Sequence, residues 1–152
     1  MNIPSILKKC SALEADIADI YRKFSGLYPE MRDLWDDIAA EEDGHAATLM
    51  FASKFAEKGQ LPNIVPHKLI TYLEGTVDMV EAVKGMIGED ALTLDDALGM
   101  ALNLEQTVHE NYLFEIMRIE FDSDVLDRLK LIATETESHA SRIKQMMEIR
   151  RK

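Results

Sequence analysis

The stretch AAEEDGHAATL, residues 39–49, carries the pattern from which the fold can be inferred. Apolar residues around it recur every three or four positions, which is typical of one face of a helix. They are Leu34, Ile38, Leu49 and Ala52. Glu42 and His45 lie on this same face, where leucines would be expected. A helix that turns a carboxylate and an imidazole toward a core must find partners for them, because an unpaired buried charge is costly.

The same spacing predicts helices in most of the remaining chain. The expected long helices cover residues 5–27, 29–58 and 94–121, and a fourth begins after the segment DSD at 122–124. In the long connection before residue 94, residues 67–74 and 76–87 are expected to form short helices. Short connections give antiparallel pairs, whereas a long one lets the third helix run parallel to the second. We therefore predict an all-α fold with residues 1–152 in a single domain: a four-helix bundle of two antiparallel hairpins joined by a long crossover.

Each predicted long helix carries polar residues near the middle of its apolar face. They are Glu14, Glu42 with His45, Glu105, and Thr136 with His139. Mid-helix positions of a four-helix bundle lie at similar heights, so we expect these side chains to converge. Carboxylates and imidazoles are good ligands for iron, manganese and zinc, and a divalent ion would satisfy several of them together. In the E-x-x-H segment at 42–45, both side chains lie on one helix face about one turn apart, within reach of one ion.

Four segments carry a resemblance to a known family. They are SALEADIADIYRKF at 11–24, IAAEEDGHAATLM at 38–50, ALNLEQTVHENYLF at 101–114 and IATETESHASRI at 132–143. These segments resemble the ferritin-like di-iron superfamily, and within it the rubrerythrin-like branch. Glu14 and Tyr21 are seven residues apart, as are Glu105 and Tyr112, which is similar to the duplicated hairpin of that family.

The resemblance implies a ferritin-like bundle with iron, as a di-iron pair, for its cofactor. It implies Glu14, Glu42, His45 and Glu105 as metal ligands, and His139 matches the histidine of the family's second E-x-x-H motif. The resemblance also implies that two tyrosines donate hydrogen bonds to ligand carboxylates. They are Tyr21 and Tyr112. No residue is assigned a catalytic role.

The chain departs from the family pattern at two ligand positions. Thr136 stands where the second motif has the glutamate that bridges the metals, and Val108 replaces a second glutamate of the third helix. A neutral threonine cannot bridge two cations, so we predict one tightly held metal and a weak or empty second position. Glu135 and His109 are the candidates to replace the lost glutamate, and that question stays open. With one cysteine, we expect no rubredoxin module.

Composition limits the class of protein and its partners. The chain has 17 basic and 28 acidic residues, a net charge of −11, which disfavours binding to nucleic acid and to acidic membranes. No apolar run approaches the ~18 residues of a membrane span. The first residues become charged too early for a signal peptide, and we expect a soluble cytoplasmic protein. Cys10 is the single cysteine, which excludes an internal disulfide.

Three functions fit this pattern. The favoured one is metal binding at a degenerate di-metal carboxylate site, with iron expected and manganese or zinc as alternatives. The second is a di-iron oxidoreductase that reduces peroxide or oxygen and takes electrons from a donor protein. The third is a metal-free structural or interaction protein of the same fold.

Apolar residues beyond the predicted core faces suggest a homodimer. They are Met31, Trp35, Leu113, Phe114 and Met117. Bundles of the resembled family often pair side by side, so we expect light scattering at micromolar concentration to give the mass of a dimer.

Overall fold

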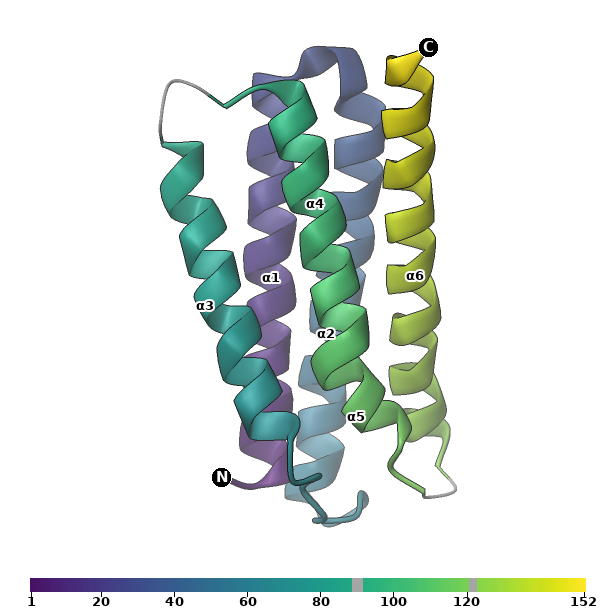
Figure 1. Cartoon of the computed structure of the whole chain (residues 1–152). Helices are drawn as coiled ribbons and strands as arrows, with labels where there is room; N and C mark the ends of the chain where they lie inside the picture. The colour runs from purple at the N-terminus through teal and green to yellow at the C-terminus, as the bar shows by residue number, and fades with distance from the viewer. Residues whose placement is uncertain (89–91, 121–122) are drawn as a thin grey trace.

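The protein is helical in every regular element of the residues that the computed structural model describes. These are residues 1–88, 92–120 and 123–152, without the side chains of residues 109 and 110. The long helices run roughly along one axis, with the two chain termini at opposite ends (Figure 1). The predicted all-α class is therefore confirmed for the described residues.

Helices α1 (Ile3–Leu27) and α2 (Arg32–Glu57) form an antiparallel hairpin (Figure 1). Helix α1 begins two residues earlier than predicted, because the side chain of Asn2 accepts a hydrogen bond from the backbone N–H of Ser5. A single 3₁₀ turn, Pro29–Met31, joins the two helices where the second helix was expected to begin. Gly59 then ends the hairpin with a φ of 72°, which a glycine adopts at no steric cost.

The long connection contains one helix, α3 (Leu69–Ile87), so the prediction of two short helices is wrong. The prediction divided this segment at Gly75, yet a glycine inside a helix costs only about 1 kcal/mol relative to alanine. Buried residues continue at helical spacing on both sides of it. They are Leu69, Leu73, Thr76, Val80 and Val83. Their burial outweighs the local cost, and α3 packs against α1 and α4.

The segment predicted as a helix over residues 94–121 is interrupted. Helix α4 (Leu94–Val108) continues into a π-helical segment, His109–Leu113, and then into the short helix α5 (Phe114–Met117). A capping box begins this segment: the Thr93 hydroxyl accepts from the N–H of Asp96, and the Asp96 carboxylate accepts from the N–H of Thr93. The extra residue of a π turn changes which side chains face inward, and here both Tyr112 and Leu113 are buried.

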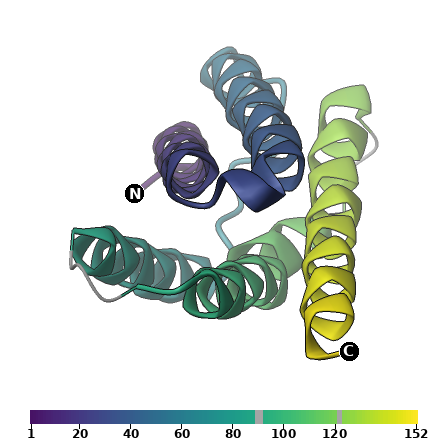
Figure 2. The same cartoon turned by 90° about the horizontal axis from the view of Figure 1, so that it is seen from above.

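Helix α6 (Asp124–Arg151) completes the fold and packs against α4 and α2. It begins at the predicted place, with the Ser123 hydroxyl accepting a hydrogen bond from the N–H of Val125. Residues 121 and 122 lie outside the described residues. Seen from above, α1, α2, α4 and α6 surround a common interior, and α3 lies beside α1 and α4 (Figure 2).

A continuous hydrophobic core joins all of the long helices. Trp35 lies fully inside it and stacks on Tyr21, with ring centroids 5.9 Å apart. Leu113 is buried as well, so these two residues are not available for the predicted dimer face. Of the residues proposed for that face, Phe114 is the exposed one. The homodimer stays a prediction, and fewer exposed apolar residues now support it.

None of the helices in the described ranges combines the length and apolar content that crossing a lipid bilayer would need.

Candidate metal centre

The predicted metal ligands come from four different helices and are all buried. Glu14 lies on α1, Glu42 and His45 on α2, Glu105 on α4 and His139 on α6. No more than 2% of the surface of any of them is exposed. Each continues the apolar face of its helix, so the packing that buries the leucines and isoleucines also buries these polar groups.

The five side chains gather into two overlapping groups of three. Glu14, Glu42 and His45 form one group, and Glu42, Glu105 and His139 form the other. Within each group, one ligating atom from every residue lies within 4.8 Å of the others. The predicted convergence is therefore present, and each group offers two carboxylates and one imidazole.

Glu42 belongs to both groups because its two carboxylate oxygens face opposite ways. Its Oε2 lies 2.8 Å from Nδ1 of His45, and its Oε1 lies 2.8 Å from Nδ1 of His139. One oxygen toward each group is the arrangement of a bridging carboxylate. The imidazole rings of the two histidines are stacked, with centroids 5.5 Å apart.

The outer nitrogens of both histidines are held by glutamates from the opposite helix. Nε2 of His45 lies 2.6 Å from Oε2 of Glu135 on α6, and Nε2 of His139 lies 2.6 Å from Oε2 of Glu41 on α2. Arg142 donates to the other oxygen of Glu41 at 3.0 Å. A carboxylate that accepts from Nε2–H turns the ring so that Nδ1 faces inward, and a metal that displaces the Nδ1 proton would then meet a histidine oriented as ligand histidines are in metal sites.

Sequence reasoning missed Glu41 and assigned Glu135 only a flanking position. A signal was present, because EEDGHA at 41–46 and ETESHA at 135–140 repeat the same order, with a glutamate four residues before each histidine. Glu135 does not enter either inner group, and its side chain is 43% exposed. It contacts the site from outside and does not replace the lost bridging carboxylate. The side chain of His109, the other candidate, lies outside the described residues.

The two tyrosines connect the helices across the centre. The Tyr21 hydroxyl of α1 donates to Glu105 of α4, and the Tyr112 hydroxyl donates back to Glu14 of α1. Burial, followed by the charge of the contacted glutamate, raises the pKa of each tyrosine well above its usual value. Both hydroxyls therefore stay protonated as donors, which agrees with the role implied by the resemblance.

Thr136 is buried at the predicted position on α6, but its hydroxyl donates to the backbone carbonyl of Ile132 at 2.9 Å. It supplies no negative charge to the centre. Val108, the other departure from the family pattern, is 2% exposed and packs in the hydrophobic core. The inner groups therefore contain three carboxylates.

Burial and mutual repulsion change the acidity of these groups. Burial, followed by the charge of Glu42, raises the pKa of Glu14 well above its usual value. Burial and the charge of Glu105 raise the pKa of Glu42 to about 7. Burial opposes a charge on His139, but the adjoining Glu105 and Glu42 outweigh it and raise its pKa to about 11. Without a metal, protons therefore supply the positive charge that these carboxylates need.

Two inward-facing atoms lack a hydrogen-bond partner within the described residues, and they show how a metal would fit. Oε2 of Glu14 and Nδ1 of His139 are both buried without a hydrogen bond. Nδ1 of His139 has Oε1 of Glu42 and Oε2 of Glu105 nearby, at 2.8 and 3.4 Å, but not with hydrogen-bond geometry. Native interiors rarely leave polar atoms unpaired. One such atom in each group, directed inward among carboxylates, suits coordination of a cation.

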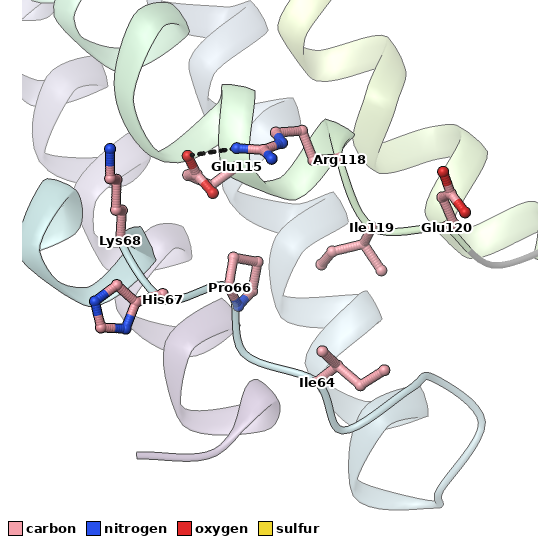
Figure 3. A pocket seen from close by; sticks show the side chains of 8 residues that line it. All are labelled: Ile64, Pro66, His67, Lys68, Glu115, Arg118, Ile119 and Glu120. Atoms are coloured by element: carbon pink, nitrogen blue, oxygen red, sulfur yellow. Dashed lines mark ion pairs between the residues drawn. The ribbon is translucent and has the colours of Figure 1, made fainter.

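A cleft of about 560 Å³ lies away from these groups, near the start of α3 and the end of α5 (Figure 3). Its lining includes Ile64, His67 and Lys68 on one side and Glu115 with Arg118 on the other (Figure 3). Arg118 lies 3.6 Å from Glu115. The lining contains none of the five predicted ligands, so we assign the candidate centre to the buried groups.

Comparisons with known proteins give no independent assignment: no family model matches the chain, and neither a curated protein nor a solved structure matches it significantly.

Proposed function

We propose that this protein is a metal-binding member of the ferritin-like fold, a four-helix bundle that holds a divalent metal in the centre formed by Glu14, Glu42, His45, Glu105 and His139. Iron is the proposed metal, with manganese and zinc as alternatives, because the donors are carboxylate oxygens and imidazole nitrogens. The observation that carries the proposal is the overlap of two three-ligand groups at Glu42.

The charge balance supports unequal occupancy of two positions. Glu14, Glu42 and Glu105 supply three negative charges, whereas two divalent ions carry four positive ones. A first ion is overcompensated by the carboxylates, and a second would bind to a centre whose charge is already reduced. The protein is therefore proposed to hold one metal tightly and a second one weakly.

Five residues in and around the centre each have a defined part in this binding. Glu42 presents one oxygen to each position. Glu41 and Glu135 accept from the outer nitrogens of the histidines and keep Nδ1 of both rings directed inward. Tyr21 and Tyr112 hold the outer carboxylates through their hydroxyls. These bonds fix the donors before the metal arrives, which lowers the ordering cost of binding.

The direct test is an anaerobic titration with Fe(II), Mn(II) and Zn(II), with the bound metal per chain counted by elemental analysis. We expect wild type to bind at least one metal and the double variant His45→Ala/His139→Ala to bind none tightly. His67→Ala is the matched control, because His67 is exposed and lies in the other cleft. Wild-type protein that binds no metal, and whose melting temperature is not raised by metal, would exclude this function.

The shared carboxylate favours one second candidate function, the reduction of peroxide or oxygen. A bound iron pair would supply two electrons for that chemistry. An electron-donor protein would then be a required partner. Anaerobic addition of one equivalent of hydrogen peroxide to Fe(II)-loaded protein tests it, because a competent pair is oxidised stoichiometrically in a single turnover. Iron that stays ferrous under these conditions leaves metal binding as the function.

A further inference from the structure

A groove of about 300 Å³ between α2 and α6 reaches the candidate centre from the surface. Its lining includes Gly44, His45 and Thr48 of α2 and Leu131 and Glu135 of α6. His45 is thus a wall residue of the groove and a member of an inner group at once. The cleft of Figure 3 has no such residue among those that line it.

The buried ligands make a passage necessary. Glu14 and His139 have no exposed surface, and Glu42 and Glu105 have 1% and 2%. An ion can reach them only where a side chain can move aside. Glu135 is suited to that movement, since its side chain is 43% exposed while its carboxylate contacts Nε2 of His45. The side chain of Glu41, also in the lining, is 41% exposed, so two carboxylates border the groove.

Gly44 lines this groove, and no neighbouring atom requires a glycine at this position. It is exposed in the interior of α2, where glycine costs about 1 kcal/mol relative to alanine. Its φ is not positive, and a Cβ added to it would meet no atom within 4 Å. Most glycines of the chain share this open space, but Gly44 is the one that lines the groove, so a bulky side chain at this position would extend into the space that the glycine leaves empty.

We propose that the α2–α6 groove is the passage by which divalent cations and ligands of peroxide size reach the centre, that Gly44 keeps it open, and that Glu135 is its gate. The proposal rests on the proposed metal-binding function. Two carboxylates, Glu135 and Glu41, and one guanidinium, Arg128, line the opening, so the lining has a net negative charge that favours cations. Withdrawal of Glu135 from Nε2 of His45 then opens the path along the imidazole to the inner carboxylates.

The first test measures the rate of Co(II) loading into metal-free protein by stopped-flow absorbance. Gly44→Phe should slow loading by about tenfold or more, as blocked access does, without changing the final metal count, because no ligand is altered. Gly75→Phe is the matched control: Gly75 is also an exposed mid-helix glycine whose added Cβ meets nothing within 4 Å. It should load at the wild-type rate. Equal rates for Gly44→Phe and wild type would overturn the proposal.

A second readout needs no metal and separates this proposal from the proposed function. Diethylpyrocarbonate modifies accessible histidines, and mass spectrometry compares His45 with the exposed His67 in the same sample. Gly44→Phe should protect His45 and leave His67 unchanged, and Gly75→Phe should change neither. Protection with no Co(II) binding in wild type would show that the groove gives access to His45, while rejecting the metal function and with it the passage of cations. If Gly44→Phe does not fold, Gly44→Leu takes its place, and an unprotected His45 in the folded variant rejects the passage.

Discussion

At the scale of single residues, the centre has a carboxylate on α2 and a neutral side chain at the matching position of α6. Glu42 touches both histidines, whereas Thr136, at the equivalent place on α6, uses its hydroxyl for the helix backbone. Glu42 is therefore the one carboxylate that the two inner groups share, and α6 supplies no second one opposite it.

Thr136→Glu should supply that partner. We expect the variant to bind close to two metals per chain, because a fourth carboxylate balances two divalent ions. Without metal it should be less stable than wild type by on the order of 2–3 kcal/mol, since another carboxyl group is buried among three. Metal titration and thermal unfolding measure both effects.

Thr134→Glu is the control for that variant, because Thr134 is exposed on the same helix and adds the same charge outside the site. Glu135→Ala tests the competing explanation. If wild type already binds two metals and Glu135→Ala removes one, then Glu135 and not Glu42 with Thr136 determines the count.

Loss of a tyrosine hydrogen bond should have a different effect from loss of a metal ligand. Tyr21→Phe and Tyr112→Phe each remove one donor from a buried carboxylate, Glu105 or Glu14, and should destabilise the metal-free protein by about 1–3 kcal/mol. Each should also weaken metal binding without lowering the number of metals bound. Tyr72→Phe is the control, because Tyr72 is a half-buried residue of α3, a helix that contributes no residue to the two inner groups. Unchanged stability and metal affinity in both variants would contradict the proposal that the tyrosine hydroxyls hold the carboxylates in place.

At the scale of elements, packing overrides local preference in α3 and in the α4 segment. Gly75 does not divide α3, because the buried residues around it continue at helical spacing. The π segment His109–Leu113 lies one turn after Glu105 and carries Tyr112 toward Glu14. π turns are rare and are frequent at functional sites, which agrees with this position beside the centre.

Two glycine substitutions test the helix assignments. Gly75→Ala should stabilise the protein by about 1 kcal/mol, because alanine is the better helix former and the added Cβ meets no neighbour. Gly59→Ala should have the opposite sign, since a φ of 72° strains any residue with a side chain. Chemical denaturation at one pH measures both. A Gly75→Ala variant less stable than wild type would indicate a break in α3.

At the scale of the whole molecule, the proposed metal binding would couple folding to the uptake of protons and of metal. The raised pKa values of Glu14, Glu42 and His139 mean that the metal-free native state binds more protons than the unfolded chain. Such groups stabilise fully below their unfolded pKa, and the stabilisation is lost as pH rises through the folded pKa. A metal bound at the proposed centre would displace these protons, so we expect its affinity to rise with pH.

We therefore expect the metal-free protein to lose stability between pH 5 and pH 8. For Glu42 the window runs from its ordinary pKa of 4.5 to about 7, and for His139 it begins at 6.5. The slope is on the order of 1 kcal/mol per pH unit for each proton involved. Saturating Mn(II) should remove or reverse this trend. Melting curves across that range, with and without metal, measure it, and metal-free stability that rises with pH would contradict the protonated centre.

The His45→Ala/His139→Ala variant serves as the reference for that experiment, because Mn(II) should not change its pH profile.

The sequence by itself determined the all-helical class and the five buried residues of the centre. Helical spacing of apolar residues is a local property, and polar residues such as Glu14 and Glu105 stand out against it without knowledge of any contact. The caps at Thr93 and Ser123 could be predicted for the same reason, since a cap involves residues three or fewer positions apart.

The tertiary structure alone decided how those residues pair. Glu42 reaches His139, and Glu41 and Glu135 cross between α2 and α6, over separations of 90 residues or more. No local pattern specifies which oxygen faces which nitrogen, because that depends on the distance and rotation between helices set by the whole core. Burial of Trp35 and Leu113, the continuity of α3 and the groove beside Gly44 follow from the same packing.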